Sequence, residues 1–270
     1  MNNFYFLPIK KITDETASIK TFHFEHELKS KAGQFVMLWI PSVGQKPFSI
    51  SNDNGKEFSL TIFKRGKVTS KLFTMQEGEN VGIAGPYGTS FSIKPDTHYI
   101  MVAGGYGVAP LRFLAKKISL ADNSTIDFCL GARSKSDLIL EKELQKIPQL
   151  RLHIATNDGN KGHRGYITDL LPSLIAGSRD QQKMVVACGP ELMEKKILDI
   201  CNQQKTPCEI SIERYIKCGI GICGQCAVDG SGICLCKEGP VVSRQMANKI
   251  TEFGIYARDG RGLKTFCTVK

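Results

Sequence analysis

Five of the ten cysteines crowd into residues 218–236, near the end of the 270-residue chain. They are Cys218, Cys223, Cys226, Cys234 and Cys236. Four residues separate Cys218 from Cys223, and two separate Cys223 from Cys226. Most of these intervening residues are glycine or isoleucine. Glycine tolerates a positive φ and has no side chain in the way, so the backbone can wrap closely around a bound group. This segment is therefore predicted to fold as a tight loop with several thiols pointing inward.

The Cys218-x4-Cys223-x2-Cys226 spacing is the one that plant-type 2Fe–2S ferredoxins use, together with a more distant fourth cysteine. A structural zinc site is the alternative. Such sites usually pair two Cys-x2-Cys-like elements, and here only Cys223 and Cys226 have that spacing. The pattern favours a 2Fe–2S cluster, with either Cys234 or Cys236 as the fourth ligand.

The cysteine content does not indicate a disulfide framework. Such frameworks are typical of short secreted chains. The N-terminal segment MNNFYFLPIKK has no basic start followed by an apolar stretch, so it does not resemble a signal peptide. We therefore expect a reducing compartment and a cytoplasmic location.

Residues 1–95 are predicted to form a β-barrel domain. Short segments rich in β-branched and aromatic residues alternate with turns such as Asn54-Gly55. Many short strands in fewer than a hundred residues indicate a small barrel. The expected strands include residues 17–26, 34–41, 47–52 and 57–64, preceded by an N-terminal strand, and a short helix is expected to start near Thr69 and run toward Met75.

From residue 96 to 206 the pattern changes to strands that alternate with helices. This alternation predicts a doubly wound α/β domain with a parallel sheet. Strands are expected at 98–103, 125–130, 151–155, 184–187 and 208–212, and helices at 108–120, 135–146, 166–175 and 191–203. Residues 207–270 then form a small C-terminal cysteine segment, so the fold class is a multidomain α+β protein.

Two glycine motifs follow strands of the expected α/β domain. Gly104, Gly105 and Gly107 precede Pro110 at the start of a helix, where glycines let backbone amides approach a pyrophosphate. Pro110 replaces the third glycine of the usual dinucleotide fingerprint, so a plain strand–helix turn is the alternative. The second motif is Cys188-Gly189-Pro190, and Cys188 ends a parallel strand, where residues face the ligand crevice.

The charge and hydropathy patterns argue against two classes of partner. The net charge of +10 is divided almost evenly, as +4, +3 and +3 over residues 1–95, 96–206 and 207–270. Nucleic-acid-binding proteins usually concentrate basic charge on one face or arm. The sequence also contains no run of about 18 apolar residues, the length that a membrane-spanning helix needs. We expect neither a nucleic acid nor a membrane as partner.

The order of these parts resembles the ferredoxin–NADP reductase superfamily, whose barrel carries an Arg-Pro-Phe/Tyr-Ser motif for FAD. Lys46, Pro47, Phe48 and Ser49 stand at the matching place, with lysine for arginine. Lysine can neutralise a phosphate but lacks the bidentate fork of arginine. A second stretch resembles the segment that runs past the flavin and contributes Ile62, Phe63, Lys64, Gly66, Val68 and Thr69. The resemblance implies that these residues, with the two glycine motifs, bind FAD and NAD(H).

Along nearly the whole chain, one branch of that superfamily matches best: the electron-transfer subunits of type B dihydroorotate dehydrogenase. The segment from Glu213 to Cys226 and the element Cys236-Lys237-Glu238-Gly239-Pro240 are close to this family's cluster motif. The resemblance implies Cys218, Cys223, Cys226 and Cys236 as cluster ligands. The sequence itself shows no acid–base pair and no Ser/His/Asp set, so we expect no catalytic residue in this chain.

The same resemblance implies a function and a partner. Electrons would pass between NAD(H), FAD, the 2Fe–2S cluster and an FMN-containing dihydroorotate dehydrogenase catalytic subunit, in pyrimidine biosynthesis. The expected assembly is a heterotetramer with two subunits of each kind. A reductase subunit of similar build that serves a ferredoxin, a hydrogenase or a sulfide-linked enzyme is the alternative.

Overall fold

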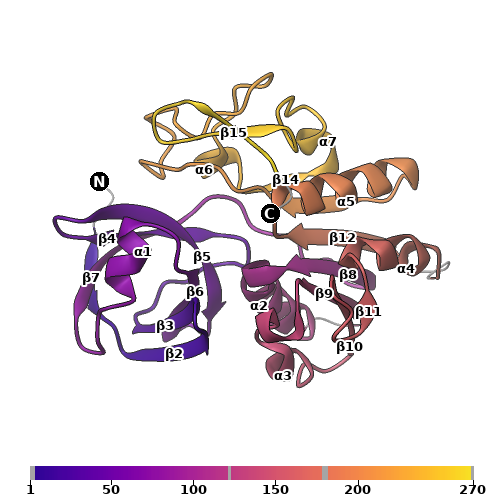
Figure 1. Cartoon of the computed structure of the whole chain (residues 1–270), viewed down its shortest axis with the longest axis horizontal. Coiled ribbons are helices and arrows are strands. Elements are labelled where there is room, and N and C mark those ends of the chain that lie inside the picture. The colour runs from indigo at the N-terminus through magenta and orange to yellow at the C-terminus, as the bar shows by residue number, and fades with distance from the viewer. Residues whose placement is uncertain (1–3, 121–122, 178–181, 269–270) are drawn as a thin grey trace.

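The computed structural model describes residues 4–120, 123–177 and 182–268 of the chain. It has three parts: a barrel, an α/β domain and a C-terminal segment that lies across the top of both (Figure 1). This arrangement confirms the predicted fold class.

The first part is a seven-stranded antiparallel sheet that curves into a half-barrel, in the order β1-β7-β4-β5-β6-β3-β2. Apolar side chains alternate along its strands and fill the interior, as period-two patterns do in half-buried sheets. Its elements are β1 (Tyr5–Pro8), β2 (Lys11–Thr16), β3 (Ile19–Glu25), β4 (Phe35–Ile40), β5 (Gly44–Asp53), β6 (Glu57–Phe63), α1 (Lys67–Leu72) and β7 (Asn80–Tyr87).

The second part is a doubly wound sheet whose strand order is β11-β10-β9-β8-β12-β13-β14. All neighbouring pairs are parallel except the last, β13 with β14. Its strands are β8 (Thr97–Gly104), β9 (Thr125–Ala132), β10 (Leu150–Thr156), β11 (His163–Arg164), β12 (Gln182–Cys188), β13 (Cys208–Ser211) and β14 (Val241–Ser243). The α-helices of this part are α2 (Val108–Ile118), α3 (Glu141–Leu144), α4 (Leu171–Gly177) and α5 (Glu191–Gln203), and the 3-10 turns are η1 (Gly105–Gly107), η2 (Lys135–Asp137) and η3 (Ile167–Leu170).

The third part contains the cysteine loop, α6 (Leu235–Glu238), α7 (Arg244–Ala247) and the hairpin of β15 (Tyr256–Arg258) and β16 (Lys264–Phe266). It is anchored to the α/β domain because β13 pairs with β12 across the predicted boundary near residue 207, and β14 then pairs with β13. The division at residues 95 and 206 stays a prediction.

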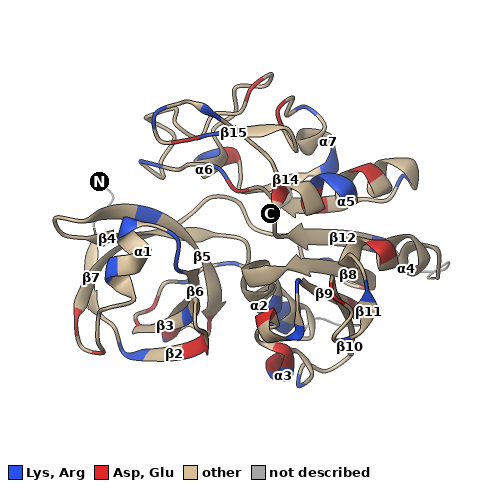
Figure 2. Ribbon diagram, in the orientation of Figure 1, with Lys and Arg blue, Asp and Glu red and all other residues tan. Residues whose placement is uncertain are grey.

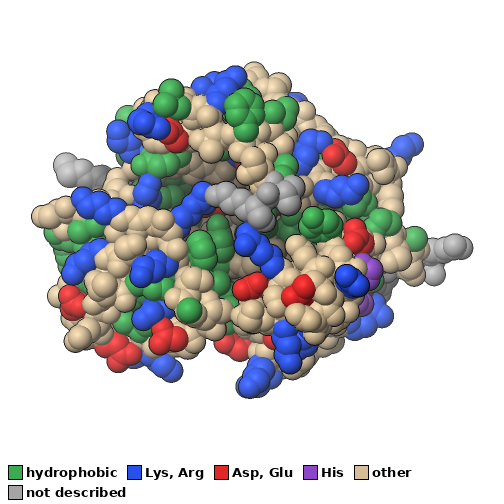
Figure 3. Space-filling model, in the orientation of Figure 1, with side chains coloured by type: hydrophobic (Ala, Val, Ile, Leu, Met, Phe, Trp, Pro, Cys, Tyr) green, Lys and Arg blue, Asp and Glu red, His purple; other side chains and the backbone are tan. Residues whose placement is uncertain are grey.

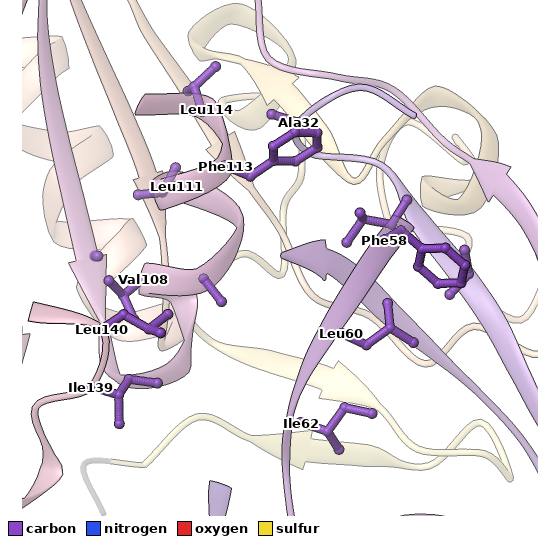
Figure 4. Close-up of a cluster of buried hydrophobic side chains, with 14 of the residues drawn as sticks. Ala32, Phe58, Leu60, Ile62, Val108, Leu111, Phe113, Leu114, Ile139 and Leu140 are labelled. Carbon is purple, nitrogen blue, oxygen red and sulfur yellow. The ribbon is translucent and has the colours of Figure 1, made fainter. Parts of the chain in front are cut away.

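One hydrophobic core continues from the barrel into the α/β domain. In Figure 4, Phe113 of α2 lies beside Ala32 of the barrel, while Leu60 and Ile62 belong to β6. The buried Arg112 of α2 also donates to the carbonyl oxygen of Ser51 at 3.1 Å and pairs with Glu143. The two domains are therefore packed firmly enough to hold residues from both in one site.

Charged side chains are distributed over all three parts (Figure 2), in line with the even charge excess of the sequence. Among the described residues, no helix is long and apolar enough to cross a membrane.

Candidate functional site

The predicted flavin motif lies in the middle of β5. Lys46, Pro47, Phe48 and Ser49 are all partly exposed, whereas Ile50 is fully buried. On β6 the side chains alternate, so Ile62 is 1% exposed and packs in the barrel core while Phe63 is 38% exposed. The structure thus leaves the β5 motif and Phe63 accessible to a ligand, and it gives the Ile62 side chain a packing role.

The rest of the second stretch forms the turn into α1. Lys64 and Gly66 are exposed, while Val68 and Thr69 are buried. The Thr69 hydroxyl accepts hydrogen bonds from the N–H groups of Arg65 and Gly66, both at 2.9 Å. Thr69 therefore holds the shape of a turn whose exposed residues can face a cofactor.

The two glycine motifs pack against each other at the carboxyl ends of β8 and β12. A Cβ atom on Gly107 would lie 2.2 Å from the carbonyl oxygen of Cys188, and one on Gly104 would lie 2.6 Å from Cδ of Pro190. A larger residue at Gly107 would displace the backbone of Cys188, and one at Gly104 would displace Pro190 and the Met193 side chain. Gly105 has a φ of 53° and open space beside it, while Pro110 is buried in the first turn of α2. The crevice floor is therefore formed by closely packed backbone, which a pyrophosphate could approach.

Titratable side chains line the same edge of the sheet. The hydroxyl of Tyr106 donates to Oε2 of Glu213 at 3.4 Å, and the negative charge of Glu213 together with burial raises the pKa of Tyr106. Burial and the carboxyl of Glu194 raise the pKa of the Cys188 thiol, so Cys188 is a neutral thiol at pH 7. Tyr106, Glu194 and Glu213 were not singled out in the sequence, because only the fold brings them beside Cys188.

The barrel and the crevice meet at two aromatic rings. Phe63, at the end of β6, and Tyr106, after β8, stack with ring centroids 5.8 Å apart and planes at 10°. The flavin segment therefore ends at the mouth of the nucleotide crevice. In the space-filling view the surface is hollowed between the three parts of the chain, with basic side chains at the edge of the hollow (Figure 3).

The cysteine loop presents thiols in close pairs. Burial by itself would raise the pKa of Cys218. Hydrogen bonds from the backbone N–H groups of Ile220 and Cys223, together with the Cys223 thiol, outweigh this effect and lower the pKa to about 6. The thiols of Cys226 and Cys236 form a second close pair. A 2Fe–2S cluster binds four thiolates in total. Across the described residues, no three His, Cys, Asp or Glu side chains are placed to hold one metal ion. The structure brings the predicted ligands together as two pairs of thiols, and the set of four stays a prediction.

Cys236 and Cys234 differ in their surroundings. Cys236 is 2% exposed, and its sulfur accepts a hydrogen bond from the N–H of Gly221 in the loop, at 3.1 Å. Cys234 is partly exposed at the start of α6, although its thiol also reaches Cys226. The contact with Gly221 favours Cys236 as the fourth ligand, and this assignment stays a prediction.

The loop is seated on the barrel next to the flavin motif. A Cβ atom on Gly219 would lie 3.0 Å from Cγ of Met37, so the loop touches β4 directly. The side-chain amide of Gln45, the neighbour of Lys46, donates to the carbonyl oxygen of Lys217 at 2.7 Å. The residue before Cys218 is thus hydrogen-bonded to the strand that carries the flavin motif.

Family models match the three parts in the same order. They are an oxidoreductase FAD-binding domain over residues 7–91, an oxidoreductase NAD-binding domain over residues 101–199, and the iron-sulfur cluster binding domain of dihydroorotate dehydrogenase B over residues 213–246. The chain therefore carries the FAD-, NAD- and cluster-binding domains that its motifs predicted.

Relatives of nearly the same length carry one name, "Probable dihydroorotate dehydrogenase B (NAD(+)), electron transfer subunit". The protein from Methanocaldococcus jannaschii is 40% identical, and the match covers 96% of both chains. The chain belongs to this family. The relative from Pyrococcus horikoshii is 40% identical over 94% of this chain and 96% of its own, and that from Thermoplasma volcanium is 32% identical over 98% and 99%. The family of electron transfer subunits predicted from the sequence motifs is confirmed, and membership implies a catalytic partner subunit.

Solved structures show the same architecture. A structure of the NADH-dependent reduced ferredoxin-NADP oxidoreductase, described in connection with flavin-based electron bifurcation, has a TM-score of 0.80 at 26% identity and covers 91% of this chain and 90% of its own. The cytochrome b5 reductase domain of Ulva prolifera nitrate reductase has a TM-score of 0.60 at 18% identity over 72% and 89%, which supports the fold alone.

Proposed function

We propose that this chain transfers electrons between NAD(H) and an FMN-containing dihydroorotate dehydrogenase catalytic subunit, through FAD and a 2Fe–2S cluster. The observation that carries the proposal is the position of the flavin motif between the other two sites. Its segment reaches the nucleotide crevice through Phe63 and Tyr106, and its strand reaches the cysteine loop through Gln45 and Lys217. Electrons crossing from the crevice to the loop would therefore pass the flavin motif.

Each site contributes a defined physical task. In the barrel, Lys46 supplies positive charge for a flavin phosphate, and the exposed parts of the 62–69 segment flank the cofactor. In the crevice, Gly104, Gly105, Gly107, Gly189 and Pro190 let the backbone approach a pyrophosphate, while Cys188 stays neutral at the meeting point. When bound, FAD can accept a hydride and release electrons singly, which suits a cluster that carries one electron at a time.

The crevice offers little acid–base chemistry for dihydroorotate itself. Removal of a substrate proton needs a positioned group with a tuned pKa. Burial raises the pKa of Glu194 well above its usual value, but Glu194 already accepts the N–H of Gly189 at 3.0 Å. We therefore assign the oxidation of dihydroorotate to the catalytic partner. We further propose a cytoplasmic assembly with two copies of each subunit.

A second candidate follows from the NADH-dependent reduced ferredoxin-NADP oxidoreductase, because that structure matches almost the whole chain. A subunit of this build could serve a ferredoxin instead of a dihydroorotate dehydrogenase.

Anaerobic titration of the purified holo-subunit tests the proposal. NADH should bleach the flavin absorbance, whereas dihydroorotate alone should leave the flavin oxidised until the catalytic subunit is added. Orotate formation by the isolated subunit would contradict the division of labour. Flavin that stays oxidised under excess NADH and excess NADPH would contradict the nucleotide site. If the reduced subunit rapidly reduces an added ferredoxin but does not reduce the catalytic subunit, the second candidate is favoured.

A further inference from the structure

Lys46 of the flavin motif contacts an aromatic ring that belongs to the cysteine segment. Its Nζ lies 3.8 Å from the centroid of the Tyr215 ring, well within the range of a cation–π interaction. None of the ion pairs formed by the described residues involves Lys46, so no described carboxylate neutralises the Lys46 ammonium group. The ammonium group keeps its charge available and is held by a neutral ring.

The Tyr215 ring is fixed from a second direction by the turn of the C-terminal hairpin. A Cβ atom on Gly260 would lie 2.7 Å from Cζ of Tyr215 and 2.9 Å from its hydroxyl oxygen. The φ of Gly260 is not in the left-handed region, so glycine is needed here for space and not for backbone conformation. The ring thus lies between a lysine of the barrel and the backbone of the turn between β15 and β16.

The backbone on both sides of this contact is also tied together. Gln45 donates to the carbonyl oxygen of Lys217, two residues after Tyr215, and the preceding Arg214 is buried in ion pairs with Glu191 and Glu252. Tyr215 is therefore not a mobile surface side chain, and it can restrict the rotamers of Lys46.

We propose that Tyr215 is a positioning residue for the flavin: it holds the Lys46 ammonium ready for a cofactor phosphate. This inference rests on the proposed flavin site. A lysine side chain that must be immobilised on binding costs affinity, and prior immobilisation removes part of that cost. Lysine lacks the rigid fork of arginine, so it gains more from such support.

Titration of FAD into the flavin-free full chain, followed by quenching of flavin fluorescence, tests the inference. Tyr215→Leu should raise the Kd for FAD about two- to tenfold, whereas Tyr215→Phe, which keeps the ring, should leave it within about twofold. Lys46→Met should raise the Kd at least as much. In Lys46→Met, adding Tyr215→Leu should cause little further loss, because the two residues would act through one contact.

Gly260 gives an independent variant far from the flavin motif in sequence. Gly260→Ala should push the Tyr215 ring away and weaken FAD binding in the same direction as Tyr215→Leu. Gly262→Ala is the matched control in the same turn: Gly262 has a φ of 83° and open space around it, so alanine there strains the backbone without touching Tyr215.

The outcomes separate the inference from the proposed function. No FAD binding by the unmodified chain would overturn the flavin site and the inference together. Normal FAD binding by the unmodified chain, with unchanged or tighter binding in Tyr215→Leu and Gly260→Ala, would overturn the inference alone. So would equal losses in Tyr215→Phe and Tyr215→Leu, or additive losses in the double variant. If Tyr215→Leu does not fold, as judged by circular dichroism, Tyr215→Phe and the Gly260→Ala and Gly262→Ala pair decide the question.

Discussion

The rings of Phe63 and Tyr106 stack nearly in parallel, 5.8 Å apart, although they come from two different domains. Both are partly exposed, at 38% and 39%. Glu213 fixes the Tyr106 hydroxyl from a third segment of the chain. The stack therefore occupies the place where the flavin segment and the nucleotide crevice meet.

We predict that this stack competes with the nicotinamide nucleotide. An aromatic pair contributes about 0.5–1.5 kcal/mol beyond the area it buries, and a nucleotide that parts the rings must overcome this energy. Tyr106→Ala should therefore lower the Kd for NADH about two- to tenfold. Equilibrium titration of the oxidised holo-subunit with a non-reducing NADH analogue measures this. Tyr166→Ala, at another exposed tyrosine, is the control. Weaker binding in Tyr106→Ala would show instead that the ring supports the nucleotide.

Replacement of the two candidate fourth ligands should give opposite results. Cys236→Ser should abolish the EPR signal of the reduced cluster, because Cys236 is buried and directed at the loop through Gly221. Cys234→Ser should keep the signal, and iron content should follow the same pattern. Loss in Cys234→Ser with retention in Cys236→Ser would reverse the assignment.

Arg214 should be needed for the attachment of the C-terminal segment. Arg214 is 7% exposed, and its guanidinium contacts both oxygens of Glu191, at 2.7 and 3.1 Å, with Glu252 at 3.6 Å. Arg214→Met would leave two poorly solvated carboxylates without their cation, at a cost of about 3–5 kcal/mol. Urea unfolding of the variant should show this loss, and cluster content should fall with it. Arg261→Met, at an exposed pair with Asp259, should change stability by less than about 1 kcal/mol. A stable Arg214→Met variant would contradict the role of this network.

The ion pairs of Asp127 should make the free energy of unfolding depend on pH. Burial opposes ionisation, but His98 and His153 at 2.9 and 2.7 Å, with Arg151, hold the pKa of Asp127 well below its usual value. A carboxylate with a lowered folded-state pKa stabilises the fold above its unfolded pKa, and this contribution is lost as the pH falls toward the folded value. Asp127→Asn should therefore destabilise the protein by about 2 kcal/mol at pH 7 and by a smaller amount near pH 3, where the contribution is only partly lost. Urea unfolding at both pH values checks this, and an equal loss at both would contradict it.

The sequence predicted the parts of the fold that depend on local pattern. The expected helix at 191–203 matches α5 (Glu191–Gln203) because Pro190 and an apolar period of 3.6 mark it locally. The expected helix at 135–146 was wrong: η2 and α3 are short and separate, and Leu140 between them has a φ of 59°. The strand β7 was missed because Gly82, Gly85 and Pro86 interrupt its pattern, whereas pairing with β1 and β4 forms it.

The site was predictable where residues act through motifs, and not where the fold joins distant segments. The glycine motifs and the Cys218-x4-Cys223-x2-Cys226 spacing are visible in the sequence, whereas spacing leaves both Cys234 and Cys236 open as the fourth ligand. The contacts of Tyr106 with Glu213 and of Lys46 with Tyr215 join residues more than a hundred positions apart, and no local pattern indicates them. The side chain of Ile62 illustrates the reverse case, since a residue in a recognised motif packs in the barrel core.

The most direct test of the account is electron transfer in the complex reconstituted from the purified holo-subunit and a dihydroorotate dehydrogenase catalytic subunit. Under anaerobic conditions, dihydroorotate and NAD should yield orotate and NADH in equal amounts only when both subunits are present. Cys236→Ser should abolish NADH formation while the catalytic subunit still oxidises dihydroorotate with an artificial acceptor. Undiminished NADH formation by the cluster-free variant, or none by the complete complex, would contradict a path from the flavin through the cluster to the partner.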